Sequence, residues 1–149
     1  MANRYYQPGE ERASRVESLF NTIASRYDLI NDLQSFGLHR HWKRHLIRRT
    51  QLQPGELALD ICCGTGDIAF GLRDAPGRVL AIDFSAPMLA AAGRRARRLT
   101  APPGQPPPLF VRGDALRLPV RDASANVVTI AYGLRNLADL DLAAREFHR

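Results

Sequence analysis

The sequence predicts an α/β fold in which mainly parallel strands alternate with helices. Three observations predict it. From residue 57 onward, short apolar runs that suit strands alternate with stretches of helical spacing. A glycine turn, Gly64-Thr65-Gly66, joins the first of these runs to a helical stretch, and an acidic residue stands at the end of each of the first three strands. Strand–helix–strand alternation implies parallel strands joined by right-handed crossovers.

Length and composition suit such a fold and exclude several other classes. The chain has 149 residues, of which 45% are apolar and 24% are charged, as in ordinary globular proteins. The longest strongly apolar stretch, residues 127–134, is far shorter than the roughly twenty residues of a membrane-spanning helix. The first residues lack the apolar core of a signal peptide, so we expect a cytoplasmic protein. Cys62 and Cys63 are adjacent, which excludes a disulfide scaffold and a zinc or other metal site.

The net positive charge of the chain comes from two short stretches. Residues 39–49 carry a net charge of +5 and residues 94–98 carry +4. Because the whole chain carries +6, the remaining residues carry −3. This pattern is compatible with an anionic partner or an anionic membrane surface, and equally with two solvated helix faces.

The first third of the chain is predicted to be helical. Between residues 10 and 24 the apolar residues recur every three or four positions, as on one face of a helix. A second helical stretch follows Tyr27-Asp28, and a third runs from about 39 to 50. Pro54-Gly55 breaks the chain. We therefore divide it into an N-terminal helical segment, 1–52, and a sheet-containing domain, 53–149.

The rest of the chain supplies the sheet. The predicted strands are residues 57–62, 78–82, 109–112 and 126–131. The predicted helices are 67–73, a helix that reaches Leu99 with Ser85 as its N-cap and Pro87 in its first turn, and a last helix from about Asp139. In such a layout the fourth strand is normally central and buried on both faces, but with four strands it becomes an edge.

The glycine turn is the strongest local sign of a ligand site. Glycines let the backbone approach a ligand closely, and a helix N-terminus favours an anionic group. The segment 64–69 also fits the dinucleotide pattern G-x-G-x-x-G/A. That pattern alone is compatible with NAD or with S-adenosylmethionine.

The positions of the acids favour S-adenosylmethionine. Asp67 stands where a pyrophosphate would meet the helix, and its charge would repel the phosphates that S-adenosylmethionine lacks. Asp60, at the end of the first strand, adds a negative charge that faces a cationic ligand. Asp83 ends the second strand and can accept from both ribose hydroxyls. Asp114, followed by the backbone N–H of Ala115, can accept from the adenine amino group. Taken singly, each acid could instead cap a helix or form a turn.

The sequence resembles class I S-adenosylmethionine-dependent methyltransferases. More specifically, it resembles the family that C-methylates prenylated quinols, demethylmenaquinone methyltransferase and its ubiquinone-pathway counterpart. Three segments carry the resemblance: residues 27–31 (Tyr-Asp-Leu-Ile-Asn) with Ser35, His39 and Trp42 after them, residues 113–119, and residues 129–136, which end in Gly-Leu-Arg-Asn. Ile30 and Gln34 depart from the family pattern, which has methionine and an aliphatic residue there.

This resemblance covers about residues 14–149 and implies a Rossmann-like sheet with only its first four strands. The family's later Lys-Pro-Gly-Gly turn is absent, so we expect a chain truncated at its C-terminal end. The resemblance implies S-adenosylmethionine as cofactor, with contacts at Thr65, Asp83, Asp114 and Ala115 and a backbone contact at Ala131. From the glycine turn and the first strand, Asp60, Gly64 and Gly66 join the predicted cofactor site.

The reaction that the resemblance implies is transfer of a methyl group to a ring carbon of the quinol, most simply demethylmenaquinol. His39 would act as general base and Arg135 would stabilise the ring oxyanion. Four other residues would line the ring pocket within a substrate cap: Tyr27, Asn31, Trp42 and Asn136. A structural contact between the N-terminal helix and the core is the alternative role for His39 and Trp42.

Partners and alternatives follow from the same residues. The basic stretch 40–49, with Trp42 beside it, predicts peripheral contact with an anionic membrane at its inner face. Nucleic acid is not expected, because no aromatic residues are interleaved with the arginines of 94–98. A methyltransferase for another small molecule and a non-catalytic fragment remain alternatives. The sequence leaves open a homo-oligomer and the choice between naphthoquinol and benzoquinol.

Overall fold

The computed structural model describes residues 38–99 and 103–149. In chain order the elements are α3 (Leu38–Thr50), β1 (Leu57–Ile61), α4 (Asp67–Leu72), β2 (Arg78–Asp83), α5 (Ala86–Ala96), β3 (Leu109–Arg112), β4 (Val127–Ile130), the 3-10 helix η2 (Leu134–Asn136) and α6 (Leu140–His148). All four predicted strands are present, each within one residue of its expected ends. The helices expected before residue 38 lie outside the described residues.

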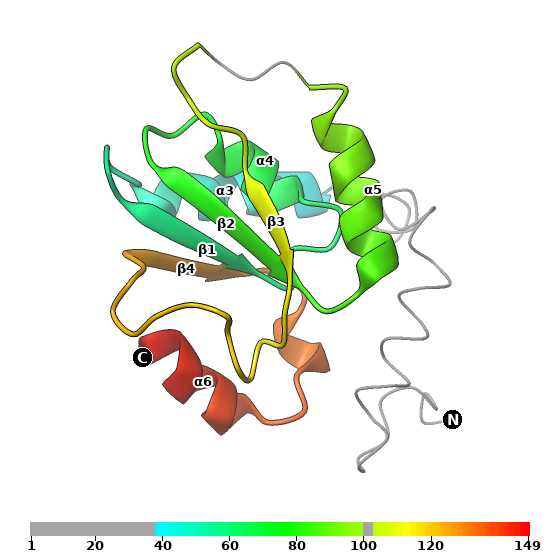
Figure 1. Cartoon of the computed structure of the whole chain (residues 1–149), viewed down its shortest axis with the longest axis vertical. Helices are drawn as coiled ribbons and strands as arrows, with labels where there is room; N and C mark the ends of the chain where they lie inside the picture. Colours follow the sequence, from blue (N-terminus) through cyan, green and yellow to red (C-terminus); the bar gives the residue numbers. More distant parts are fainter. Residues whose placement is uncertain (1–37, 100–102) are drawn as a thin grey trace.

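The four strands form one parallel sheet in the order β3-β2-β1-β4 (Figure 1). In the register of this sheet, Asp60 of β1 lies opposite Ala81 of β2 and Thr129 of β4. β4 pairs with β1 and forms one edge of the described sheet, as expected for four strands. The carboxyl ends of all four strands meet at one side, where ligands bind in open α/β sheets.

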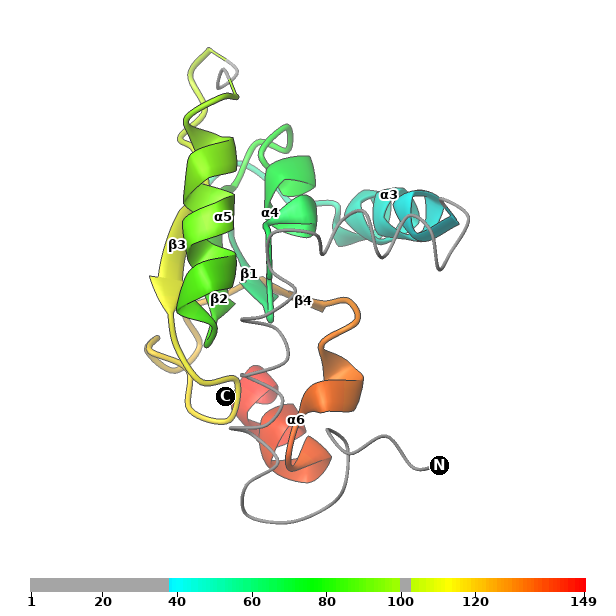
Figure 2. The same ribbon diagram turned by 90° about the vertical axis from the view of Figure 1, so that its right-hand side faces the viewer.

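Alternating residues of the strands build a core on each face of the sheet. Ala58, Val79 and Ala81 pack with Ile68 and Leu72 of α4, on the face that α3 also covers. The neighbours of those residues along β1 and β2 pack on the other face, against α6 and the β3–β4 connection. Figure 2 shows α3, α4 and α5 apart from α6. The period of two in β1 and β2 thus accounts for helices on both faces.

Side-chain caps begin both later helices, at the predicted N-cap Ser85 and at Asp139, the predicted start of the last helix. The backbone N–H of Met88 donates to Ser85 Oγ over 3.4 Å at the start of α5. The N–H of Leu142 donates to Asp139 Oδ1 over 2.8 Å at the start of α6. Each cap satisfies an N–H that the first helical turn leaves unpaired.

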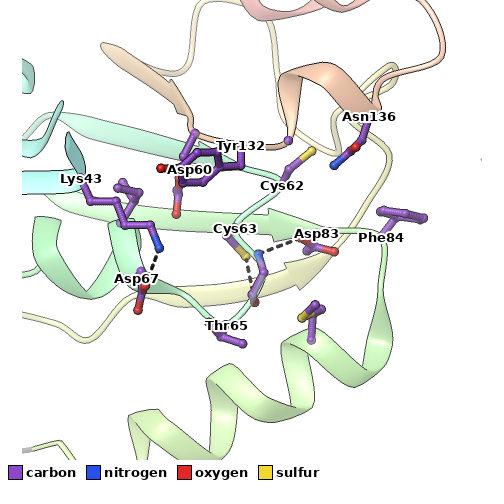
Figure 3. Close-up of a pocket in the computed structure, with 15 residues that line it drawn as sticks. Lys43, Asp60, Cys62, Cys63, Thr65, Asp67, Asp83, Phe84, Tyr132 and Asn136 are labelled. Atoms are coloured by element: carbon purple, nitrogen blue, oxygen red, sulfur yellow. Dashed lines mark hydrogen bonds and ion pairs between the residues drawn. The ribbon is translucent and has the colours of Figure 1, made fainter. Parts of the chain in front are cut away.

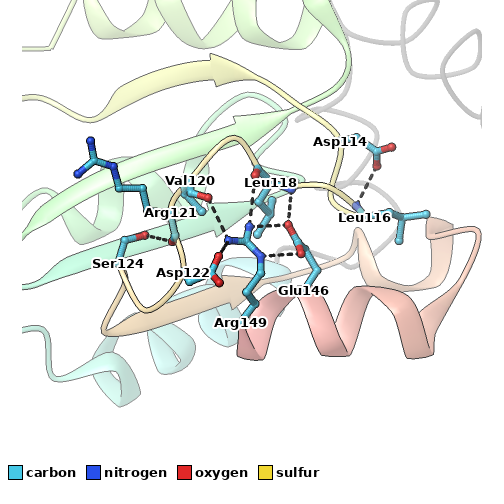
Figure 4. A network of polar contacts seen from close by, with 9 residues as sticks. All are labelled: Asp114, Leu116, Leu118, Val120, Arg121, Asp122, Ser124, Glu146 and Arg149. Atoms are coloured by element: carbon cyan, nitrogen blue, oxygen red, sulfur yellow. Dashed lines mark hydrogen bonds and ion pairs between the residues drawn. The ribbon is translucent and has the colours of Figure 1, made fainter.

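A charged network fixes the connection between β3 and β4 (Figure 4). Arg149 pairs with Glu146 over 2.7 Å and with Asp122, and it donates to the carbonyls of Leu118 and Val120. The backbone N–H of Leu118 donates to Glu146 Oε1 over 2.6 Å. The hydrogen bond from Arg149 lowers the pKa of Glu146. This network holds α6 against the connection, which also carries Asp114 and Ala115.

Candidate functional site

A cleft opens at the carboxyl end of the sheet, where three loops meet (Figure 3). The loops follow β1, β2 and β4, and α3 closes the cleft on one side. This half of the cleft is lined by residues that include Lys43, Asp60, Cys62, Cys63, Gly64, Thr65, Asp67, Asp83, Phe84, Met88, Ala131, Tyr132 and Asn136. β1 lies between β2 and β4, so the cleft sits at the switch point of the strand order.

A second hollow continues the cleft toward the β3–β4 connection. The two share Cys62, Asp83, Phe84 and Asn136, and the second adds a group of residues after β3: Gly113, Asp114, Ala115 and Leu116. Asp83 therefore stands between the two halves. Of the residues predicted to bind the cofactor, those around the glycine turn lie in one half and Asp114 and Ala115 lie in the other.

Gly66 differs from the other predicted cofactor residues, because it does not line either half of the cleft. It is buried with a φ of 88°, and a Cβ added there would lie 2.9 Å from the Phe70 ring and 3.0 Å from the Phe110 ring. Glycine is required at this position by the backbone conformation and by packing. Gly64, with a φ of 55°, is the glycine that faces the cleft.

Asp83 is held rigidly at the centre of the cleft. Its Oδ2 accepts from the backbone N–H of Gly64 over 2.8 Å and its Oδ1 accepts from that of Ser85 over 2.9 Å. The residue is 6% exposed, and burial raises the pKa of its carboxyl. Two carboxylate oxygens offer about four acceptor positions, so each can accept another hydrogen bond from a ligand.

Asp60 lines the cleft, and its carboxyl also links β1 to neighbouring elements. It is 1% exposed, and it accepts hydrogen bonds from the backbone N–H of Ala69 over 3.1 Å and from Thr129 Oγ1 over 3.0 Å. Burial raises its pKa to about 7, so the carboxyl is only partly ionised at neutral pH. A contact between Asp60 and a cationic ligand stays a prediction.

Asp67 is also engaged by the protein itself. Its carboxylate pairs with Lys43 from α3 over 2.6 Å and with Arg95 from α5. Burial raises the pKa of Asp67, but the hydrogen bonds from Arg95 and Lys43 outweigh burial and hold the pKa below its usual value. Because two cations compensate this charge, the argument that Asp67 would repel a pyrophosphate fails.

The residues predicted for catalysis and for the ring pocket are dispersed in the described structure. Asn136 lines both halves of the cleft, and its buried Oδ1 has no hydrogen-bond partner among the residues that the structure describes. Arg135 lies beside it on η2 and is exposed. His39 is 3% exposed and lines a separate groove between α3, α4 and α5. Trp42 is 53% exposed. Tyr27 and Asn31, which stay predictions, lie outside the described residues.

Several lining residues were missed by the sequence reasoning. Phe84 follows Asp83 directly and Met88 lies in the first turn of α5, so their closeness to Asp83 along the chain could have indicated them. Lys43 and Tyr132 could not be found in this way. Lys43 reaches the cleft because α3 packs beside α4, a contact between segments that are distant in sequence.

The strand order, the glycine turn after β1 and the acids that follow β2 and β3 define a class of protein, the class I methyltransferases with a Rossmann-like sheet. Comparison with known proteins makes the assignment specific. The chain belongs to the ubiE/COQ5 methyltransferase family, whose sequence profile matches residues 8–149.

Two curated relatives and one solved structure illustrate the likeness. The chain is 41% identical over 139 residues to the ubiquinone/menaquinone biosynthesis C-methyltransferase UbiE of Rubrivivax gelatinosus, covering 93% of this chain and 52% of the relative. It is 40% identical over 152 residues to the demethylmenaquinone methyltransferase of Lactiplantibacillus plantarum, covering 100% of this chain and 60% of the relative.

The solved structure has the same fold. It is a putative S-adenosyl-L-methionine-dependent methyltransferase from Methanococcus maripaludis, with a TM-score of 0.62 and 20% identity. The match covers 100% of this chain and 62% of that one. The chain thus spans between half and two thirds of the length of these three proteins.

Proposed function

We propose that this protein binds S-adenosylmethionine in the cleft and transfers its methyl group to a ring carbon of a prenylated quinol, with demethylmenaquinol as the first candidate. The observation that carries this proposal is the position of Asp83 between two halves of one cleft. The names of the two relatives, one for ubiquinone and menaquinone biosynthesis and one for demethylmenaquinone, support the substrate class.

The residues of the cleft fit the parts of this cofactor. Asp83, with acceptor positions left on both oxygens, suits the two ribose hydroxyls. Asp114 and Ala115 in the second half suit the adenine amino group and a ring nitrogen. Oδ1 of Asn136, which has no partner among the described residues, could accept a hydrogen bond from a ligand. Such a bond would remove the cost of about 1–3 kcal/mol that a buried, unpaired acceptor imposes on stability.

The bound cofactor would supply an electrophilic methyl group on a sulfonium. The chain's own residues would orient the quinol and hold charge on its oxygen. We propose that Asn136 accepts a hydrogen bond from a ring hydroxyl and that Arg135 stabilises the oxyanion. His39 lines the groove that shares Lys43 and Asp67 with the cleft, and it is proposed as the base that takes the hydroxyl proton at that boundary. Tyr27, Asn31 and Trp42 are proposed as further walls of the ring pocket.

Methyl transfer from labelled S-adenosylmethionine to a short-tailed demethylmenaquinol tests the proposed function. We expect His39→Ala and Arg135→Ala each to lower turnover at least tenfold in folded protein. The melting temperature should be unchanged in Arg135→Ala and lower in His39→Ala, because His39 is buried. Arg121→Ala is the matched control, since Arg121 is exposed on the β3–β4 connection. Cofactor binding without methyl transfer would favour the non-catalytic alternative, and absence of cofactor binding would overturn both.

We also propose that α3 contacts an anionic membrane surface, where a prenylated quinol would be dissolved. Leu38 is 55% exposed and lies one turn before the exposed Trp42, and the helical spacing places the exposed Arg49, two turns after Trp42, on the same face. Exposed apolar residues beside arginines are typical of helices that lie on a bilayer. Among the described residues, no helix has the length and apolar character needed to cross a membrane.

Sedimentation with vesicles checks this contact. We expect binding to vesicles that contain an anionic lipid, weaker binding in high salt, and little binding to zwitterionic vesicles. Arg49→Ala should weaken binding about fivefold, because each arginine near such a surface contributes about 1 kcal/mol. Arg121→Ala serves as control again. Binding that is insensitive to salt and to Arg49 would contradict the proposal.

A further inference from the structure

Lys43 is the one lysine of the chain, and it projects from α3 into the cofactor half of the cleft (Figure 3). Its side chain is 13% exposed. The ammonium donates to Asp67 Oδ2 over 2.6 Å and lies 6.0 Å from the centre of the Tyr132 ring. The position of the Lys43 side chain is therefore fixed by its contacts with the protein.

Charge around Lys43 is unevenly distributed. Among the described residues that line this half of the cleft, the other charged side chains are Asp60, Asp67 and Asp83, and Lys43 is the one Lys or Arg. The second cation on Asp67, Arg95, belongs to the groove on the other side of α4 and does not line the cleft. An anionic group that enters beside the glycine turn therefore has Lys43 as its cationic partner in this part of the structure.

The ammonium also has donors left over. A lysine ammonium carries three N–H groups, and the contact with Asp67 uses one of them. Arg95 donates to Oδ1 of Asp67, the oxygen that Lys43 does not contact. The Asp67 carboxylate therefore stays in place when Lys43 donates another N–H to a ligand in the cleft. Thr65 of the glycine turn lines the same half of the cleft.

We propose that the Lys43 ammonium binds the α-carboxylate of the cofactor's methionine end. The inference rests on the proposed function and names a binding residue within that site. S-adenosylmethionine carries one carboxylate, and Lys43 is the one Lys or Arg among the described residues that line this half of the cleft. Since Lys43 belongs to α3, the same contact links cofactor binding to the position of the N-terminal segment.

The test compares S-adenosylmethionine with decarboxylated S-adenosylmethionine, which differs only in lacking the carboxylate. In Lys43→Gln the amide can still donate to Asp67, so the link to α4 is kept while the charge is removed. By calorimetry we expect this variant to bind S-adenosylmethionine at least tenfold more weakly than the wild type does. Its affinity for the decarboxylated compound should change less than twofold.

Two further variants separate binding from structure. Lys43→Arg keeps the charge and should recover most of the preference for the carboxylate. Arg95→Met removes the other cation from Asp67 without touching the cleft, so any loss should be equal for both compounds. Equal losses in Lys43→Gln would overturn the role of Lys43 and leave the cofactor site standing. A wild-type chain that binds neither compound would overturn the proposed function and this inference with it.

Discussion

Replacing Asp83 with alanine is expected to weaken the binding of S-adenosylmethionine roughly 10- to 150-fold, because a hydrogen bond to a charged acceptor contributes about 1.5–3 kcal/mol. Asp83 lies where the two halves of the cleft meet, and both of its oxygens can still accept a ribose hydroxyl. Calorimetric titration of the variant and the wild type measures the effect directly.

The same substitution also removes two internal hydrogen bonds. The backbone N–H groups of Gly64 and Ser85 lose their acceptor, and each buried donor left unpaired costs about 1–3 kcal/mol of stability. The melting temperature without ligand must therefore be recorded beside the affinity. Asp74→Ala is the matched control, since this carboxylate is exposed and pairs only with its neighbour Arg73. Wild-type affinity in a folded Asp83→Ala variant would contradict the role of Asp83.

Asp60→Asn is expected to change how stability depends on pH. The pKa of Asp60 rises from 3.8 to about 7 on folding, so the folded state holds this proton more tightly than the unfolded chain does. The contribution of Asp60 to the free energy of unfolding has its full value below pH 4. This contribution falls as the pH rises toward 7 and no longer changes above that. Between pH 5 and pH 8 the wild type should lose about 3 kcal/mol that the variant keeps.

Asparagine can replace this aspartate without leaving a polar atom unpaired. Its oxygen can accept from the backbone N–H of Ala69, and its amide can donate to Thr129 Oγ1, which lies 3.3 Å from the carbonyl of Leu59 and can donate there. Urea unfolding at several pH values between 5 and 8 measures the difference between variant and wild type. A difference that is constant over this range would show that Asp60 does not titrate there.

Most of the sheet could be predicted from the sequence because its signals are local. The apolar runs, the glycine turn and the caps at Ser85 and Asp139 each involve residues that are neighbours in sequence. The cofactor residues followed from the same logic, since acids at the ends of parallel strands meet at one edge of the sheet. Asn126, expected at a strand start, is found there with its Oδ1 accepting from the backbone N–H of Leu57.

What the sequence reasoning missed depends on contacts between distant segments. The charge of Asp67 is compensated by residues 24 and 28 positions away, and the proton affinity of Asp60 depends on burial beneath α4 and β4. No local pattern reveals either effect. The position of His39 likewise depends on how α3 packs against α4, a contact between distant segments. This packing places the His39 side chain in the groove between α3, α4 and α5.

The two cysteines of the cleft give this protein a built-in chemical reporter. Cys62 and Cys63 are the only thiols in the chain and both line the cleft. Burial raises the pKa of Cys62 to about 12 and raises that of Cys63 as well, so almost no reactive thiolate exists at neutral pH. Alkylation of both thiols in the native protein is therefore expected to be slow, and faster alkylation would report a change of structure at this end of the sheet.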